Sequence, residues 1–368
     1  MELPFATAEV TEGRARLRVP DVPRRKGPNP KGPYPFYNPT MAVSRDLSTI
    51  VLSGWPSRLT SVCDGLAASG AWGIRMAVEA DIGPVTFNDR SPSACALVRE
   101  NADRNGVDAE VVSGDLRSLL GERSFQYVDI DPFGPPTPFL GHALHALPPG
   151  SGLGVTATDT APLFGTYPKT CERRYGAQPL RCTQGHEIGL RILLGYVERV
   201  AQAHGKAVRP LVAFHAEHFL RLHLEVTDGS RDRDSHLGYV LRDPSGMFVP
   251  AGESEPHAVG PLWITSLSDS GFLLGLSPSP WTGPQSGRLL SLLQGEADFP
   301  AFFVTTDEMA HRLRTSPPRV ERFLEGLQDL GHRAVRTHFD PHGVKTDAPA
   351  DEIAKAFHAA KSSGPTGD

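Results

Sequence analysis

Short apolar runs alternate with helix-favouring stretches along the first 228 residues of the chain. The runs have the length of buried strands and end in turn residues: 59–62, 84–88, 109–112, 125–130, 152–156, 211–214 and 219–226. Helical stretches are expected at 45–52, 73–79, 91–105 and 186–204, the third with Ser91 as cap and Pro92 at its first position. This alternation predicts an α/β fold built on a doubly wound, mostly parallel sheet.

Changes in composition divide the chain into four regions. Residues 1–35, rich in proline and arginine, are expected to form an extended basic arm, and 36–228 the domain built on the parallel sheet. After Asp228 the apolar runs shorten and Pro/Gly turns multiply, so 229–360 is interpreted as a smaller α+β domain. Residues 361–368 have the composition of a disordered tail. A length of 368 residues agrees with more than one core.

Charge is unevenly distributed. The net charge is −5, from 37 Lys and Arg against 42 Asp and Glu, which argues against a general nucleic-acid coat. Seven basic residues nevertheless lie between Arg14 and Lys31, with Asp21 as the single acid, and a second basic stretch includes Lys169, Arg173, Arg174 and Arg181. Both stretches could contact phosphates, although most charged runs are ordinary solvated surface.

Several classes of protein and site are not expected. The four cysteines show no C-x-x-C spacing, so neither a zinc cluster nor a disulfide framework is indicated. His215, His218 and His223 alternate between the two faces of their strands and are interpreted as hydrogen-bonding histidines, not metal ligands. No apolar run reaches membrane-spanning length and no signal peptide is recognised, so a cytoplasmic location is expected.

The most informative motif runs from Asp129 to Pro136 and follows a buried strand. Asp131, Pro132 and Phe133 combine a carboxylate, a residue that ends the strand ladder and an aromatic ring. This set suits a planar ring that carries an amino group, because the carboxylate accepts a hydrogen bond from the amine and the aromatic stacks on the ring. A plain strand-to-turn junction would have a similar sequence.

Acidic residues follow three further strands. The first strand leads through Asp64 into a loop of small residues ending at Gly70, which would let the backbone approach a ligand. Asp89 ends the second strand, where nucleoside-binding folds place the carboxylate that binds ribose hydroxyls, and Asp115 follows the third, suited to an adenine amino group. One such acid is more often a helix cap. Three together favour a site for an adenosyl donor.

The chain resembles the tRNA (guanine(26)-N2)-dimethyltransferase family from Glu12 to about Pro349. The shared motifs occur in the family's order: Phe36 to Ser48, Asp129 to Gly134, Thr156 to Gly165, His186-Glu187 with Arg191, Gly260 to Trp263, and Arg336-Thr337-His338 with Lys345-Thr346-Asp347. The resemblance implies methylation, once or twice, of the exocyclic N2 amine of a tRNA guanine, with S-adenosyl-L-methionine as donor.

The resemblance also implies roles for single residues. Asp131 matches the catalytic carboxylate, Phe36 and Phe133 match aromatics that frame the target base, and Arg45, Asp89 and Asp115 match donor-binding residues. Trp72 stands where the family has an arginine suited to the donor's carboxylate, so Arg45 or Arg75 is expected to take that role. Members with zinc carry four cysteines before Gly260, which this chain lacks.

Two other classes of function stay open. One is an aminomethyltransferase that acts on DNA adenine or on a protein amide. The other is a non-catalytic tRNA-binding protein, which the tryptophan at position 72 makes conceivable, although Asp131 and Asp89 are both present. If the protein acts on tRNA, the C-terminal domain is expected to contact it. Arg336, His338 and Lys345 are the residues to test there if the basic arm proves to be ordinary solvated surface.

Overall fold

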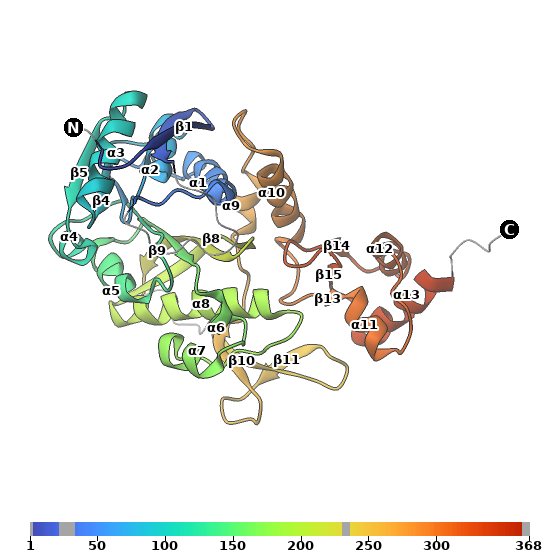
Figure 1. Ribbon diagram of the computed structural model, residues 1–368. Coiled ribbons are helices and arrows are strands. Elements are labelled where there is room, and N and C mark those ends of the chain that lie inside the picture. The colour runs from blue at the N-terminus through green and yellow to red at the C-terminus, as the bar shows by residue number, and fades with distance from the viewer. Residues whose placement is uncertain (1–2, 22–33, 230–235, 363–368) are drawn as a thin grey trace.

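The computed structural model describes residues 3–21, 34–229 and 236–362. Its centre is a seven-stranded sheet with strand order β5-β4-β3-β6-β7-β9-β8 (Figure 1). Five strands are parallel: β3 Val62–Asp64, β4 Val85–Asp89, β5 Ala109–Ser113, β6 Tyr127–Ile130 and β7 Gly152–Ala157. Two longer strands complete one edge in antiparallel pairing: β8 Lys206–Ala216 and β9 Phe219–Asp228. The predicted doubly wound, mostly parallel sheet is confirmed.

Helices cover both faces of this sheet. One apolar cluster joins one face to α1 Ala42–Ser53, α2 Ala71–Glu79 and α3 Pro92–Asn105, with the short 3-10 helix η1 Pro39–Met41 before them. A second cluster joins the other face to α4 Leu116–Glu122, α5 Thr137–Ala146, α6 Thr160–Leu163, α7 Pro168–Tyr175 and α8 Gly185–Ala203. The expected helices are all present. The first strand begins three residues later than predicted, because Val62 is the first residue to pair with β4 and β6.

The expected extended arm is wrong for residues 7–20. Strands β1 Thr7–Glu12 and β2 Ala15–Pro20 form an antiparallel hairpin that packs on α2 and α3. Ala15, Leu17 and Val19 are buried, and the Asn101 side chain on α3 both accepts from and donates to the backbone of Arg18. The period-two alternation from Ala15 to Val19 was the missed signal. Residues 22–33, with the remaining basic residues of this region, lie outside the described ranges.

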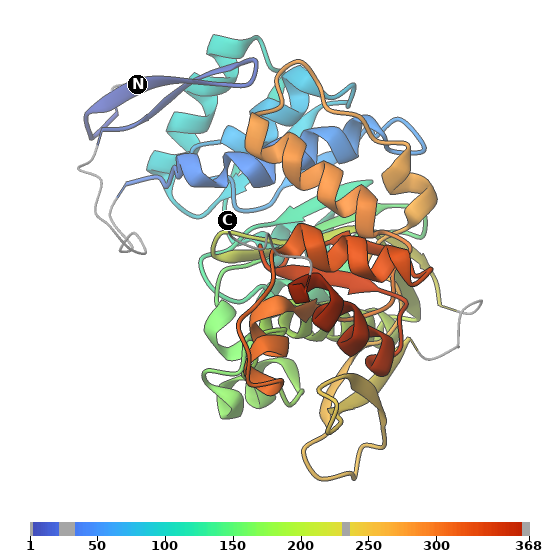
Figure 2. The ribbon, with the colours of Figure 1, turned by 90° about the vertical axis from the view of Figure 1, so that its right-hand side faces the viewer.

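The chain beyond β9 is not one separate body. Strands β10 Leu237–Arg242, β11 Phe248–Ala251 and β12 Val259–Trp263 form a small sheet against α8, and helices α9 Ser270–Leu274 and α10 Pro284–Glu296 join the cluster of α1. Figure 2 shows the β10–β11 hairpin projecting from the lower end of the molecule. The expected boundary at residue 228 therefore does not coincide with the separation of the cores.

A third apolar cluster begins at Val304. It contains the last elements: β13 Val304–Thr305, α11 Thr306–Arg312, α12 Val320–Asp329, β14 Ala334–Arg336, β15 Gly343–Thr346 and α13 Ala350–Ser362. These helices lie on the opposite side of the molecule from the N-terminal hairpin (Figure 1). The first two residues of the expected tail belong to α13, and 363–368 lie outside the described residues. Within the described ranges, no helix is long and apolar enough to cross a membrane.

Candidate active site

The acidic residues predicted at strand ends gather along one edge of the sheet. Asp64, Asp89 and Asp115 follow or end the adjacent parallel strands β3, β4 and β5, and Asp131 follows β6. Because parallel strands end at the same edge, these residues lie along the carboxyl edge, where doubly wound sheets bind their ligands.

Asp64 is buried and supports the first turn of α2. Its carboxylate accepts a 3.1 Å hydrogen bond from the backbone N–H of Gly73, and a Cβ at Gly73 would lie only 2.4 Å from the Phe87 ring. Glycine is therefore needed for α2 to approach β4. Gly70, with φ of +76°, lets the loop reverse before the helix. Burial, with the nearby Asp129 carboxylate, raises the pKa of Asp64 well above its ordinary value.

Asp89 joins the loop after β3 to the start of α3. One carboxylate oxygen accepts from the Ala68 backbone N–H at 2.9 Å, and the other accepts from the Ser91 N–H at 2.8 Å. The preceding Asn88 donates to the Gly65 carbonyl, while its side-chain oxygen is buried without a hydrogen-bond partner among the described residues. An acceptor is thus held beside the loop for a ligand.

Asp115 is a helix cap, which is one of the two roles that the sequence left open. It caps α4 by accepting from the Arg117 backbone N–H at 2.9 Å, and the Arg117 side chain pairs with the same carboxylate at 2.7 Å. These hydrogen bonds hold the pKa of Asp115 below its usual range. The side chain is partly exposed at the carboxyl end of β5, so it stays ionised and accessible as an acceptor.

Two carboxylates follow each other on β6 and have different surroundings. Asp129 is buried and forms an ion pair with Arg221 of β9, in which Nη2 lies 2.5 Å from Oδ1. Asp131 lies just beyond the end of the strand and is half-buried. Burial and the neighbouring Asp129 raise the pKa of Asp131 to about 6, although Arg221 and a hydrogen bond with Thr156 act in the opposite direction. A carboxylate with this pKa can exchange a proton near neutral pH.

The two aromatic residues predicted at the site come together. Phe36 precedes η1 and Phe133 follows Asp131, and their rings meet edge to face with centroids 4.6 Å apart. Phe133 is 54% exposed, so much of its ring surface is accessible. The pair thus presents accessible aromatic surface within two residues of Asp131.

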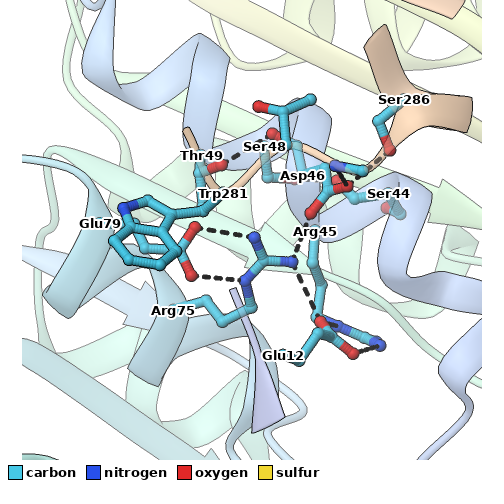
Figure 3. A network of polar contacts seen from close by, with 12 residues as sticks. Glu12, Ser44, Arg45, Asp46, Ser48, Thr49, Arg75, Glu79, Trp281 and Ser286 are labelled. Atoms are coloured by element: carbon cyan, nitrogen blue, oxygen red, sulfur yellow. Dashed lines mark hydrogen bonds and ion pairs between the residues drawn. The ribbon is translucent and has the colours of Figure 1, made fainter. Parts of the chain in front are cut away.

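The two candidate arginines form one buried network (Figure 3). Arg45 makes a two-pronged ion pair with Glu12, at 2.5 and 2.6 Å. Arg75 is fully buried, and each of its guanidinium nitrogens donates to a carboxylate, of Glu79, Asp46 or Glu12. Burial disfavours the ionised Glu12, yet pairing with Arg45 and Arg75 leaves its pKa below the ordinary value. The expectation that Arg75 could bind a donor carboxylate is not supported by these contacts, because each of its three nitrogens already donates to a carboxylate of the protein.

Trp72 lies in the first turn of α2. Its indole stacks on Tyr127 with ring centroids 6.0 Å apart, and only 8% of the residue is exposed. The indole N–H is buried and has no hydrogen-bond partner among the described residues. A buried donor without a partner is costly, so this group is suited to an acceptor supplied by a ligand.

The histidines considered as metal ligands do not converge. His215 stacks on His186 with centroids 4.0 Å apart, whereas His223 is fully buried 2.9 Å from the Tyr127 hydroxyl and His218 is exposed. Burial, with His186 and His338, lowers the pKa of His215 to about 3. In the described ranges, no group of three metal-ligating side chains comes together.

Two residues expected to contact RNA are instead buried between α8 and the C-terminal elements. Lys345 lies 3.4 Å from the Glu187 carboxylate and 3.9 Å from Glu296, and the His338 ring contacts Glu296 as well. The partly exposed Arg336 pairs with Glu321. The side chains of His338 and Lys345 are therefore engaged inside the protein, against α8 and α10, which disfavours both as RNA contacts.

The two basic stretches also differ. Three residues of the first contact the protein itself: Arg14 donates to the Val78 carbonyl, the backbone N–H of Arg16 donates to Asn105, and Arg18 pairs with Glu100. The second basic stretch lies on α7 and just after it. Lys169, Arg173 and Arg181 are exposed, whereas Arg174 is half-buried and pairs with Asp159. The α7 stretch follows β7 and α6, and so lies close to the carboxyl edge.

The buried ion-pairing roles of Arg221 and Glu12 were not predicted from the sequence. Arg221 lies in the run Phe219-Leu-Arg-Leu-His-Leu, and a charged residue inside a strand buried on both faces requires a charged partner. That signal was present. Glu12 gave none, because its partners are 33 and 63 positions away.

Comparison with known proteins agrees with the motifs and the fold. Residues 13–358 match the model of the family described as N2,N2-dimethylguanosine tRNA methyltransferase. The tRNA (guanine(26)-N(2))-dimethyltransferase of Methanospirillum hungatei is 38% identical, with 94% of this chain and 97% of that protein aligned. The Thermococcus kodakarensis enzyme of the same name is 36% identical, with 95% and 98% aligned.

A solved structure extends the comparison to three dimensions. Trm1 from Pyrococcus horikoshii in complex with S-adenosyl-L-methionine superposes with a TM-score of 0.85 at 33% identity, covering 95% of this chain and 99% of that one. The chain belongs to the N2,N2-dimethylguanosine tRNA methyltransferase family.

Proposed function

We propose that this protein methylates and then dimethylates the exocyclic N2 amine of a guanine in tRNA, at position 26, with S-adenosyl-L-methionine as methyl donor. Family membership and the likeness to a donor-bound Trm1 support the reaction class. The observation in this chain that carries the proposal is Asp131: a half-buried carboxylate with a pKa of about 6, beside the Phe36–Phe133 pair at the carboxyl edge.

The residues around the β3 loop fit an adenosyl donor. Asp89 is placed for the ribose hydroxyls and Asp115 for the adenine amine, while Asp64 and Gly70 shape the loop against which the donor would lie. The unpaired Asn88 oxygen and Trp72 indole N–H offer further polar contacts. Arg45 is favoured over Arg75 for the donor's carboxylate, because its Nη1 makes no hydrogen bond within the described residues.

The chemistry of the amine explains why a carboxylate is needed. When bound, the donor supplies an electrophilic methyl group on a sulfonium sulfur. The guanine amine is a weak nucleophile because its lone pair is delocalised into the ring, so holding it in line with the methyl supplies much of the rate. Asp131 accepts the amine proton as the N–C bond forms and the S–C bond breaks, a general-base role worth about two to four powers of ten.

The target base also has to leave its stack in the tRNA. Extrusion costs a few kcal/mol, which a new stacking partner offsets. The exposed ring of Phe133, held by Phe36, is the proposed partner. The tRNA backbone is proposed to contact the α7 basic stretch, residues 22–33 and the elements after Val304. Since tRNA is the substrate, a cytoplasmic location belongs to the same proposal.

A nucleoside assay tests this function. The protein would be incubated with methyl-labelled donor and an unmodified tRNA transcript, and the nucleosides analysed by mass spectrometry. N2-methylguanosine and N2,N2-dimethylguanosine are expected, and both should disappear when guanine 26 is replaced by adenine. Label incorporated only into DNA or protein would replace the proposal by another aminomethyltransferase activity. Binding of tRNA without any incorporation would indicate a non-catalytic tRNA-binding protein.

A further inference from the structure

Arg221 reaches Asp129 across an intervening strand. Arg221 lies on β9, opposite Thr156 of β7, and Asp129 lies on β6, opposite Gly154 of β7. A Cβ at position 154 would lie 2.1 Å from the Asp129 carboxylate and 2.9 Å from Arg221 Nη2. Glycine at this position therefore opens the path by which the guanidinium crosses β7.

The guanidinium is held in one orientation. Nη2 contacts Asp129 at 2.5 Å and Ser48 at 3.1 Å, Nη1 donates to the Thr156 hydroxyl at 2.9 Å, and Nε lies 3.3 Å from His223. Arg221 and Asp129 are both almost fully buried. A buried ion pair adds little net stability compared with apolar residues of similar size, so it invites a functional explanation.

Thr156 connects this pair to Asp131. Ile130 of β6 pairs with Val155 of β7, so the next positions along the two strands bring Asp131 beside Thr156. The Thr156 hydroxyl oxygen accepts from Arg221 Nη1, which leaves its single proton available to Asp131. The charged or polar groups that act on Asp131 come from every neighbouring element: Asp129 on β6, Asp64 on β3, Thr156 on β7, Arg221 on β9 and Arg45 on α1. Asp129 opposes ionisation of Asp131, whereas Arg221 and the Thr156 hydroxyl favour it.

We propose that the Asp129–Arg221 ion pair, acting through Thr156, is a positioning device that sets the orientation and protonation state of the catalytic Asp131. Both side chains of the pair are almost fully buried, so neither is assigned a contact with the substrate. They act on the Asp131 carboxylate through two opposing buried charges, the Asp129 carboxylate and the Arg221 guanidinium. This inference rests on the proposed methyl transfer, in which Asp131 has to be ionised in order to accept a proton.

The test uses variants with opposite expected signs. Single-turnover methylation of tRNA would be measured against pH, and activity should fall as pH drops through the pKa of Asp131. Asp129→Asn removes a negative neighbour of Asp131. The acid limb of the pH–rate profile, the range over which activity falls on acidification, should therefore shift to lower pH by about one unit. Arg221→Met removes a positive neighbour, so the acid limb should shift to higher pH by a similar amount. Arg221→Lys keeps the charge, so its acid limb should lie near that of wild type.

Two further variants keep the test decisive. If Arg221→Met does not fold because Asp129 is left unpaired, the double variant Asp129→Asn/Arg221→Met removes both charges, and its limb should return to within a few tenths of a unit of wild type. Thr156→Val should raise the apparent pKa and slow the reaction at least tenfold near pH 6, whereas Thr156→Ser, which keeps the hydroxyl, should not. The inference would be overturned if the acid limb lay at the same pH in wild type, Asp129→Asn and Thr156→Val.

A readout without catalysis separates this inference from the proposed function. The carboxyl carbon of Asp131 can be followed by NMR in protein labelled at aspartate, its signal identified by its absence from the spectrum of Asp131→Asn. If wild type does not methylate tRNA, the proposed function is wrong, yet the NMR titration still decides whether Asp129 and Arg221 shift Asp131 in opposite directions. Shifts in the same direction, or none, would contradict the inference even in an active enzyme.

Discussion

The Ser286 hydroxyl, in the first turn of α10, donates a 2.6 Å hydrogen bond to Asp46 on α1, 240 positions earlier in the chain. The backbone N–H of Gly283 donates to the same carboxylate oxygen, and the other oxygen pairs with Arg75. One carboxylate thus joins a helix from the later part of the chain to the network that holds α1, α2 and the N-terminal hairpin (Figure 3).

Ser286→Ala should destabilise the protein. The substitution leaves a buried carboxylate oxygen with one donor fewer, which should lower the free energy of unfolding by about 1–3 kcal/mol. Ser291→Ala on the exposed face of the same helix is the matched control, because among the described residues its hydroxyl donates only to the Gly287 carbonyl. Urea unfolding of both variants checks this. Equal midpoints would show that the hydrogen bond to Asp46 contributes nothing to the docking of α10.

Asp131→Asn should reduce methyl transfer by about two to four powers of ten, because the amide cannot accept the amine proton. Donor affinity, measured by calorimetry, should stay within a few-fold of wild type, since Asp131 is assigned to contact the target guanine and not the donor. Asp103→Asn, on the exposed side of α3, controls for the change of an acid to an amide. Turnover near the wild-type rate would remove Asp131 from the mechanism.

Asp89→Ala should weaken donor binding by about 1–3 kcal/mol, the cost of leaving the Ala68 and Ser91 N–H groups and the bound ribose without an acceptor. Asp115→Ala should have a smaller effect, because its carboxylate is already engaged by the Arg117 side chain and is 31% exposed. Calorimetric titration with the donor, at matched thermal stability, ranks the two variants. Unchanged affinity in Asp89→Ala would exclude a ribose contact.

The α7 basic stretch should contribute to tRNA binding. Reversing Lys169 and Arg173 to Glu should weaken binding and flatten its salt dependence by about 0.7–0.9 in log K per log salt for each phosphate that the variant no longer neutralises. Arg58→Glu with Arg123→Glu makes the matched control, because both arginines precede strands at the opposite edge of the sheet. Donor affinity should be unchanged in both.

A companion variant tests the other basic stretch. Reversal of Arg24, Arg25 and Lys26 addresses the segment between the hairpin and Tyr34, which lies outside the described residues. If both reversals bind tRNA like the control at every salt concentration, phosphate contacts have to come from elsewhere, and the exposed face of the elements after Val304 is the next region to test.

The sequence by itself determined the alternation of strands and helices, the sheet they form and the placement of the acids at one edge. These features depend on local periodicity and on the rule that parallel strands end together. Ser91, Pro92 and Gly106 set the limits of α3 in the same local way, so that helix was predicted to the residue. The contact between the Phe36 and Phe133 rings was implied by motifs shared with a known family, although the two residues lie far apart in the chain.

The partners of buried charges were decided only by the tertiary structure. Arg75 was a candidate for binding the donor and Lys345 a candidate for contacting RNA, yet each lies buried against carboxylates from distant segments. Arg221 meets Asp129, 92 positions earlier, because β9 pairs with β7 and Gly154 leaves room to cross it. A buried charge requires a partner, which the sequence alone can indicate. Which partner it finds depends on how the elements pack, and no local pattern encodes that choice.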